Sequence, residues 1–316
     1  MPLAYVFPGQ GSQAVGMLAD LANDHPIVEE AFEEASQALG YDLWAVSQQG
    51  PAEKLNQTQV TQPALLAAGV AVFRLWQQLG GQQATIMAGH SLGEYTALVC
   101  ADVIIFGDAV KLVEYRGQAM QEAVPKGAGA MAAILGLDDE QVIQACKQAA
   151  GDEIVSAVNF NSPGQVVIAG EVAAVERAIE EAKQLGARKA IPLPVSVPSH
   201  CTLMKDAADK LAQRLEEVDF KPATMPVVQN VDAQVCESIA EIRDALVRQL
   251  YLPVRWVECV QYMARHGADG FLECGPGKVL AGLNRRIDRG MGMYPVYDSA
   301  SLEAALEKTA TGSGHE

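Results

Sequence analysis

The segment Gly89-His90-Ser91-Leu92-Gly93 places a serine between two glycines in the pattern G-x-S-x-G. This pattern is typical of a nucleophile elbow, a sharp turn between a strand and a helix that exposes a serine hydroxyl. Residues 84–88 predict a buried strand and residues 92–100 predict a helix, as an elbow requires. The Ser91 hydroxyl would lie at the positive end of that helix, and the Leu92 N–H would face the oxyanion formed on attack at a carbonyl carbon. The alternative is that Ser91 only caps the helix.

A serine nucleophile needs a base that takes its proton. The chain has five histidines. Four are poor candidates because they lie in a polar loop, at a predicted helix end, in the C-terminal tail, or beside the serine with the side chain directed away (His25, His266, His315 and His90). His200 remains as the candidate base. An ordinary hydrogen-bonded loop histidine is the alternative at this position.

Two kinds of segment must position these residues. Outside the middle of the chain, apolar strands alternate with helices, which predicts one α/β domain with a mainly parallel sheet. The predicted strands cover residues 3–7, 84–88, 226–229 and 270–274, and the predicted helices cover 28–39, 62–79, 92–100, 108–123, 204–217, 239–250 and 254–265. The active cleft of such a domain lies at the carboxyl ends of its strands.

The middle of the chain has a different order of elements. Strands are predicted at residues 130–135, 154–159, 165–169 and 188–193, with helices at 138–149 and 171–185. The order β-α-β-β-α-β predicts a ferredoxin-like α+β subdomain at residues 127–198. The main domain is then discontinuous and consists of residues 1–126 and 199–316. His200 follows the crossing between the two and should line the cleft between them.

Charge and cysteine content exclude several classes of protein. A formal net charge of −16 argues against a nucleic-acid-binding protein. The six cysteines form no C-x-x-C pair and no zinc-ligand spacing, so we expect no metal, and reduced thiols in a cytoplasmic protein. The N-terminus lacks signal-peptide features and no apolar run is long enough to span a membrane. We expect a monomer whose last residues, 309–316, are disordered.

Four segments together resemble the acyltransferase family of fatty-acid and polyketide synthesis, which includes the malonyl-CoA:acyl carrier protein transacylases. They are FPGQGSQ at 7–13, GHSLGEY at 89–95, PSH at 198–200 and ECGPG at 273–277. The resemblance covers about residues 3–300 and implies an α/β-hydrolase-like fold with a ferredoxin-like insertion. It also implies the reaction, in which a malonyl group passes from malonyl-CoA through an ester of Ser91 to the phosphopantetheine thiol of an acyl carrier protein. No bound cofactor is implied, because the coenzyme A thioester is a substrate.

The resemblance also assigns roles by position. Ser91 resembles the acylated residue and His200 resembles its general base. Gln10 resembles the glutamine whose backbone N–H forms the oxyanion hole with that of Leu92. Arg116 resembles the arginine that pairs with the malonyl carboxylate, a role that suits a planar guanidinium with a permanent charge.

Further assignments concern the surroundings of these residues. Gln249 resembles the residue that orients the histidine, where a carbonyl oxygen would stabilise an imidazolium less than a carboxylate does. Ser199 is expected near the acyl Cα. Asn159 and Asn161 are expected at the edge of the insertion that faces the cleft, as substrate contacts.

Carrier docking on this acidic molecule needs local positive charge. The candidates are Lys278, Arg285 and Arg286, on or near one short predicted helix, and Lys189 at the edge of the insertion. The alternative for each group is an ordinary solvated face.

Three other functions share part of the pattern. A serine esterase or thioesterase would use the same elbow, an acyltransferase could take methylmalonyl-CoA, and a binding subunit would need no chemistry. Arg116, the segment at 7–13 and the lack of an assignable acid partner for His200 favour acyl transfer over hydrolysis. The sequence alone does not separate malonyl from methylmalonyl groups.

Overall fold

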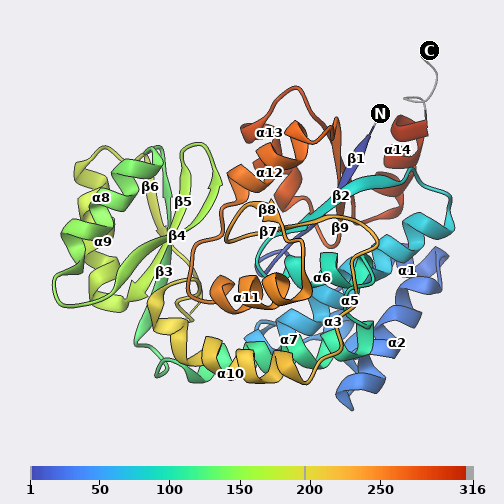
Figure 1. Ribbon diagram of the computed structural model, residues 1–316, viewed down its shortest axis with the longest axis horizontal. Coiled ribbons are helices and arrows are strands. Elements are labelled where there is room, and N and C mark those ends of the chain that lie inside the picture. Colours follow the sequence, from blue (N-terminus) through green and yellow to red (C-terminus); the bar gives the residue numbers. More distant parts are fainter. Residues whose placement is uncertain (1, 196, 311–316) are drawn as a thin grey trace.

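The computed structural model describes residues 2–195 and 197–310, and its main feature is a six-stranded sheet with the order β10-β9-β1-β2-β7-β8 (Figure 1). The strands are β1 (Leu3–Phe7), β2 (Ala84–Gly89), β7 (Val227–Gln229), β8 (Gln234–Val235), β9 (Gly270–Cys274) and β10 (Gly292–Val296). All neighbouring strands of this sheet run parallel except β7 and β8, which are antiparallel. The prediction of a mainly parallel sheet is confirmed.

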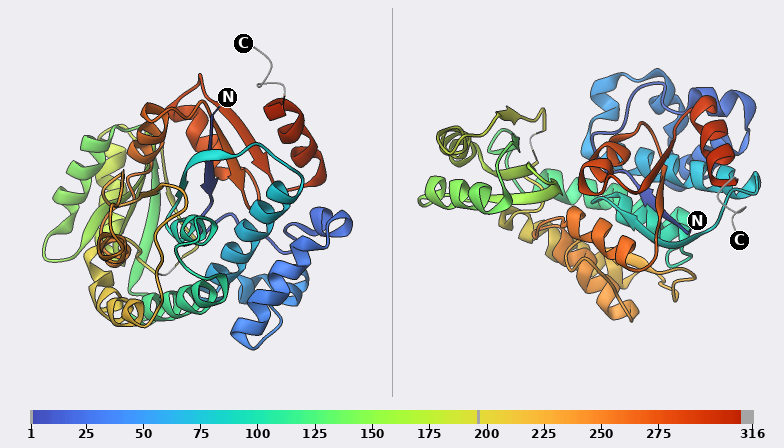
Figure 2. Two further views of the ribbon diagram at one scale, coloured as in Figure 1. Left: turned by 45° about the vertical axis from the view of Figure 1, so that its right-hand side comes forward. Right: turned by 90° about the horizontal axis from the view of Figure 1, so that it is seen from above.

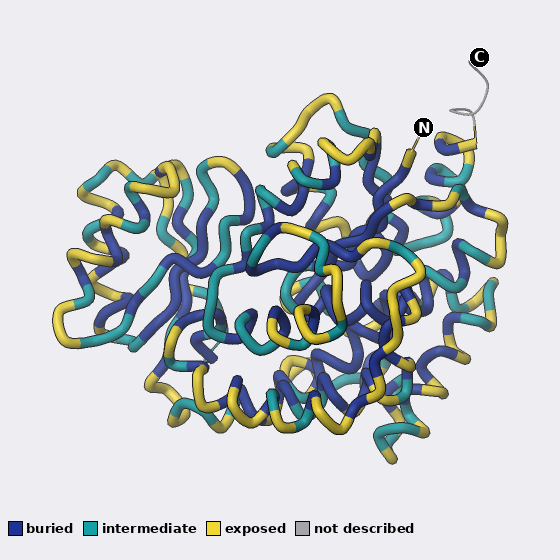
Figure 3. The backbone as a smooth tube through the Cα atoms, viewed as in Figure 1, coloured by how far each residue is buried: buried dark blue, intermediate teal, exposed yellow. Residues whose placement is uncertain are grey.

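Helices cover both faces of this sheet because alternate side chains of β1 point to opposite faces. The odd-numbered residues of β1 belong to a core formed with α2 (Ile27–Leu39), α5 (Thr58–Gln78) and α7 (Phe106–Glu122). The even-numbered residues belong to a core formed with α12 (Trp256–Arg265) and α13 (Val279–Ile287). Figure 3 shows the central strands as a buried layer between helices with exposed outer faces.

A second, four-stranded sheet lies beside the first (Figures 1 and 2). Its order is β4-β5-β3-β6, and all neighbouring strands are antiparallel. The strands are β3 (Gly129–Leu135), β4 (Val155–Ser162), β5 (Gln165–Glu171) and β6 (Lys189–Pro192), with helices α8 (Asp139–Ala150) and α9 (Val172–Gln184). The two helices pack on this sheet around a core of their own. The prediction of a second, ferredoxin-like α+β unit is confirmed, whereas the domain boundaries at 126, 127, 198 and 199 stay predictions.

A main-chain bridge joins the second sheet to the segment before α12, near the candidate site. Val254 pairs with Asn159 of β4 in an isolated parallel bridge. The N–H of Val254 donates to the carbonyl of Val158 at 2.8 Å, and the N–H of Phe160 donates to the carbonyl of Val254 at 3.0 Å. The end of β4 is therefore fixed to the segment that leads into α12.

Several elements were not predicted. They are α1 (Ala19–Asp24), α3 (Leu43–Gln49), α4 (Ala52–Leu55), β8, β10 and α14 (Ser299–Ala310). Thr309, expected in a disordered tail, is instead buried at the end of α14, where its hydroxyl donates to the carbonyl of Ala305. Residues 311–316, which include His315, lie outside the described residues. The remaining helices are α6 (Gly93–Cys100), α10 (Lys205–Glu216) with a short 3₁₀ turn before it (Thr202–Met204), and α11 (Ile239–Gln249).

Helix starts differ by a few residues from the predicted ones. Helix α7 begins at Phe106, whereas the predicted helix begins at Asp108. Ile105 precedes its first turn, and Phe106 is buried in the core. In the described part of the chain, no helix is both long and apolar enough to cross a membrane.

Candidate active site

Ser91 stands on a sharp turn between the carboxyl end of β2 and the start of α6 at Gly93. Its φ of 51° lies in the left-handed region that non-glycine residues rarely adopt. The two glycines of the motif make the turn possible, since a Cβ on Gly89 would lie 1.8 Å from the carbonyl carbon of Gly93. A Cβ on Gly93 would lie 2.1 Å from the carbonyl oxygen of Phe7 at the end of β1. The predicted strand, turn and helix around Ser91 are all present.

His200 lies within hydrogen-bond distance of the serine. Its Nε2 is 2.8 Å from Ser91 Oγ, and its Nδ1 is 2.6 Å from the main-chain oxygen of Gln249. A carbonyl oxygen can only accept, so Nδ1 carries the proton and Nε2 is free to accept from the Ser91 hydroxyl. The ring thus has the tautomer that a general base for Ser91 requires.

Gln249 orients His200 through its backbone rather than through its side chain. The side chain serves other partners: its Oε1 accepts from Arg116 Nη2 at 2.9 Å, and its Nε2 donates to the main-chain oxygen of Ser91 at 3.0 Å. The histidine therefore has a neutral carbonyl partner where a conventional triad has a carboxylate.

Arg116 projects from α7 into the same site and is only 1% exposed. Its Nη1 donates to Gln62 Oε1 at 2.8 Å, and its Nη2 lies 3.4 Å from Ser91 Oγ. Its Nε has no partner, and no described carboxylate forms an ion pair with the guanidinium. Glu94 attracts the guanidinium from beyond ion-pair distance and the Tyr95 ring lies 5.3 Å from its centre, so no directly bonded carboxylate among the described residues balances this buried charge next to the serine.

Burial and the positive charge of Arg116 lower the pKa of His200 from 6.5 to about 3. A lowered histidine pKa means that the ring stays neutral, and able to accept a proton, at all pH values well above that number. We therefore expect the single-turnover rate of Ser91 acylation to change little between pH 8 and about pH 5. Rapid-quench measurements across this range test the expectation. A rate that falls by half near pH 6.5, the ordinary value for histidine, would contradict it.

A cleft of about 190 Å³ opens above these residues, between the two sheets. Gln10, which follows β1, and Leu92, which follows Ser91, both line it. Neither of their backbone N–H groups donates to another group in the part of the chain that the structure describes. Both are available to an oxyanion beside Ser91 Oγ. The walls include Met120 of α7 and several residues of the insertion or its exit, namely Met131, Asn159, Leu193, Pro194, Val195, Val197 and Ser199.

Of the two asparagines expected to contact substrate, only Asn159 lines the cleft. Asn161 is buried, and its Oδ1 lies 2.7 Å from Nε2 of His90. The cause is a bulge in β4, where Phe160 pairs with Val166 and Ser162 pairs with Gln165, so that Asn161 is left over. A bulge re-aims the extra side chain. The structure places Asn161 beside His90 and outside the lining of the cleft, and its contact with substrate stays a prediction.

Of the candidate docking residues, Arg286 and Lys189 lie at one end of the second sheet, whereas Lys278 and Arg285 lie beside Met293 and Pro295 of β10 in the first sheet. Lys278 precedes α13, and Arg285 and Arg286 are exposed on it. Arg286 Nη1 donates to Gln165 Oε1 at 2.7 Å. Gln165 pairs across the sheet with Leu135, which in turn pairs with Lys189. Two strand spacings, about 10 Å, therefore separate the backbones of Gln165 and Lys189.

Sequence reasoning missed three polar residues at the site: Gln62, which holds Arg116, and Asn230 and Glu94, which contact each other behind the elbow. Burial raises the pKa of the Glu94 carboxyl to about 7. Asn230 directly follows β7, so the rule that sites gather at the carboxyl ends of parallel strands could have found it. No group of His, Cys, Asp and Glu among the described residues is arranged to hold a metal ion.

A half-buried serine on an elbow, a buried histidine bonded to it and a buried arginine beside both line a cleft between two sheets, which defines a serine acyltransferase-like site. The sequence matches the acyl transferase domain family over residues 4–292, and the chain belongs to this family. Within it, the chain groups with proteins named malonyl CoA-acyl carrier protein transacylase. The protein of that name from Escherichia coli K12 is 62% identical over 305 residues, which cover 96% of this chain and 98% of that protein.

Solved structures agree with this placement. An acyl carrier protein S-malonyltransferase from Vibrio cholerae is 60% identical, covers 96% of this chain and 99% of its own, and superposes with a TM-score of 0.94. A malonyl-transacylase solved in complex with its type II PKS acyl-carrier protein is also 60% identical, covers 98% of this chain and 100% of its own, and has a TM-score of 0.96.

Proposed function

We propose that the chain transfers a malonyl group from malonyl-CoA to the phosphopantetheine thiol of an acyl carrier protein, through a malonyl ester on Ser91. The observation that carries the proposal is the placement of Arg116. Its guanidinium is buried, lies 3.4 Å from Ser91 Oγ and forms no ion pair with any carboxylate in the described part of the chain. An acyl group that ends in a carboxylate supplies the missing negative charge at the correct distance from the attacked carbonyl.

In the first half-reaction, Ser91 Oγ attacks the thioester carbonyl and its proton passes to Nε2 of His200. The backbone N–H groups of Gln10 and Leu92 donate to the oxyanion of the tetrahedral intermediate. The intermediate collapses as the carbon–sulfur bond breaks, and Nε2 returns the proton to the departing sulfur. Free coenzyme A leaves, and the malonyl group remains as an ester of Ser91.

In the second half-reaction, the carrier thiol gives its proton to His200 Nε2 and attacks the ester carbonyl. The carbon–oxygen bond breaks, and Ser91 recovers its proton from the histidine. The route uses the thioester as its activated substrate and needs no bound cofactor or metal. A ping-pong dependence of the rate on the two substrates follows.

Hydrolysis is the second candidate reaction, because an esterase shares the elbow. Arg116 argues against a general esterase, since a buried cation beside the nucleophile disfavours neutral acyl chains. Methylmalonyl-CoA carries the same carboxylate. Ser199, which lines the cleft next to His200, is the proposed contact to the acyl Cα. The names of the relatives favour malonyl over methylmalonyl groups.

Isolation of the acyl-enzyme separates transfer from hydrolysis. The enzyme is exposed to malonyl-CoA, freed of small molecules by gel filtration and mixed with holo-carrier, and both proteins are weighed by mass spectrometry. The proposal predicts that the malonyl mass moves from enzyme to carrier faster than it is lost in buffer. Equal loss with and without carrier would identify a hydrolase.

Carrier docking is proposed at the basic residues on and before α13, together with Lys189. Arg285→Glu should raise the KM for carrier by about threefold to tenfold, the effect of reversing one exposed charge at a rim. Acylation by malonyl-CoA alone should stay unchanged. Lys147→Glu, an exposed charge reversal on α8, is the matched control. Equal KM values for the two variants would remove α13 from the docking surface.

We further propose a cytoplasmic monomer that binds no nucleic acid. The six cysteines are unpaired, which favours a reducing compartment. The formal net charge of −16 disfavours nucleic acid.

A further inference from the structure

Asn230 contacts both sides of the nucleophile elbow. Its Oδ1 accepts from the N–H of Ser91 at 2.7 Å, and its Nδ2 donates to the carbonyl of Gly89 at 2.7 Å. Strands β2 and β7 pair in parallel at Met87 with Val227 and at Ala88 with Val228. The side-chain amide of Asn230 thus continues this pairing past the end of β7, where it bonds residues 89 and 91 as a neighbouring peptide unit would.

The main chain of Asn230 is also held on both sides. Its N–H donates to Glu94 Oε2 at 2.7 Å, and its carbonyl accepts from the N–H of Arg255 at 3.1 Å. The residue is 0% exposed. All four of its polar groups are therefore occupied inside the protein, and water cannot replace them at the elbow.

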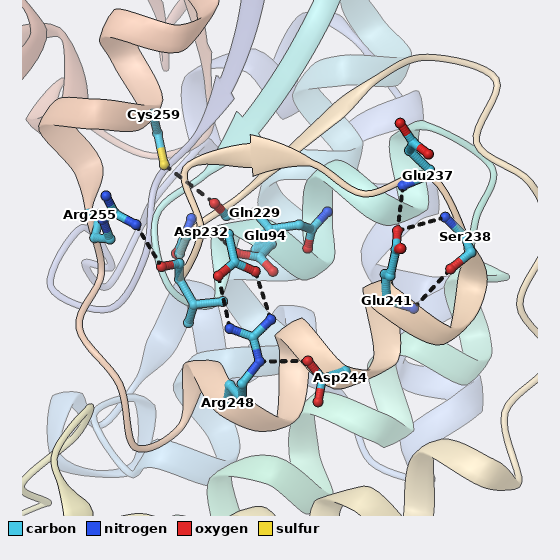
Figure 4. A network of polar contacts seen from close by, with 12 residues as sticks. Glu94, Gln229, Asp232, Glu237, Ser238, Glu241, Asp244, Arg248, Arg255 and Cys259 are labelled. Carbon is cyan, nitrogen blue, oxygen red and sulfur yellow. Dashed lines mark hydrogen bonds and ion pairs between the residues drawn. The ribbon is translucent and has the colours of Figure 1, made fainter.

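The neighbours of Asn230 are fixed from two helices (Figure 4). From α11, Arg248 donates to both carboxylate oxygens of Asp232, at 2.9 and 2.6 Å, and to Asp244. From α12, the thiol of Cys259 donates to the carbonyl of Gln229 at 3.6 Å. The segment that carries Asn230 is thus tied to two helices that contribute no residue to the lining of the cleft.

From these contacts we infer that Asn230 is a positioning residue for the nucleophile, which holds the elbow so that Ser91 Oγ lies in line with His200. This inference rests on the proposed role of Ser91 as the acylated residue. Ser91 has a φ of 51°, and a free turn would relax from this conformation. The Ser91 N–H is bonded to Asn230, so it takes no part in the oxyanion hole, which is left to Gln10 and Leu92.

The residue type is required by this arrangement. A side-chain amide carries an acceptor and a donor on two separate atoms of one plane, so Asn230 can accept from the Ser91 N–H and donate to the Gly89 carbonyl at the same time. An alanine offers neither group. An aspartate carboxylate keeps the acceptor but directs its second oxygen at a carbonyl oxygen. The expected acylation rate is therefore highest in wild type, lower in Asn230→Asp and lowest in Asn230→Ala.

The first test is single-turnover acylation by malonyl-CoA, without carrier. Asn230→Ala should lower the rate constant about 10²-fold, as for a nucleophile misplaced by about an ångström, while the half-saturating malonyl-CoA concentration changes less than threefold. Asn230→Asp should lose about 10-fold. Asn284→Ala is the matched control, because Asn284 is equally buried but binds Trp256 Nε1 instead of the elbow. A loss of the same size in this control, or wild-type rates in Asn230→Ala, would overturn the inference.

The second test reads the elbow directly and does not depend on activity. Asn230 is the acceptor of the Ser91 N–H, so amide hydrogen exchange at Ser91 should become at least about tenfold faster in Asn230→Ala and stay unchanged in Asn284→Ala. Unchanged exchange at Ser91 in a folded Asn230→Ala protein would also refute the positioning role. Failure of wild type to form any Ser91 adduct would instead refute the proposed function, whatever the variants do.

Discussion

Replacing His200 with alanine should lower the rate constant for acylation of Ser91 by malonyl-CoA about 10³-fold at pH 7. The ring is the only described base within hydrogen-bond distance of Ser91 Oγ, and its tautomer is fixed by the carbonyl of Gln249. His90, the other histidine close in sequence, is bonded to Asn161 and cannot substitute for it. Without a base, the residual rate should rise with pH, because hydroxide must then remove the serine proton.

The control for this prediction is Gln249→Ala. Every residue at position 249 supplies a main-chain carbonyl, so His200 keeps its orientation in this variant. The loss should stay below about 10-fold and should reflect the bonds from the Gln249 side chain to Arg116 and to the backbone of Ser91. Equal losses in the two variants, or a rate within tenfold of wild type for His200→Ala, would contradict the role of His200 as the base.

Replacing Arg116 with alanine should lower kcat/KM for malonyl-CoA by about 10²-fold to 10³-fold. The variant loses two charge-assisted hydrogen bonds to the malonyl carboxylate, worth roughly 3–4 kcal/mol in a buried site. Transfer from acetyl-CoA, which has no carboxylate, should stay the same or rise, since the unpaired cation is gone. The ratio of malonyl to acetyl transfer therefore measures the role of Arg116. Any loss of protein stability in the Arg116→Ala variant would lower both rates equally and leave this ratio unchanged.

Arg116→Lys is the informative companion. Lysine keeps the positive charge but cannot bond Gln62, Gln249 and a carboxylate together in the plane that a guanidinium offers. It should retain a preference for malonyl over acetyl groups but fall well below wild type in kcat/KM. A ratio of malonyl to acetyl transfer that stays at the wild-type value in Arg116→Ala would show that another residue binds the carboxylate.

The parts of the fold with strong patterns could be predicted from sequence. The five apolar residues of β1 and the strand, turn and helix around Ser91 follow from local pattern, as does the β-α-β-β-α-β order of the second sheet. Strand β10 was missed because it is a half-buried edge strand that contains Pro295, which weakens a strand pattern. Helix α14 was missed because most of its residues are small or polar, and only Leu302, Ala305 and Thr309 are buried.

Within the site, residue types could be predicted, but not which atom acts or how a side chain is aimed. The resemblance links position 249 to His200, and in the structure the main-chain oxygen of Gln249 makes the contact, because α11 ends there and leaves that carbonyl free. Asn159 and Asn161 would share a face in a regular strand. The bulge that separates them depends on pairing with β5, which a single sequence does not specify. Asn230 belongs to no sequence motif, and only its position directly after β7 indicates that it lies at the site.

The central claim is that Ser91 carries the malonyl group, and intact-protein mass spectrometry after brief exposure to malonyl-CoA tests it most directly. Wild-type protein should gain the mass of one malonyl group and release one equivalent of coenzyme A, and Ser91→Ala should gain nothing. An adduct of the same mass on Ser91→Ala, or malonyl transfer to carrier without any adduct on wild type, would contradict the claim.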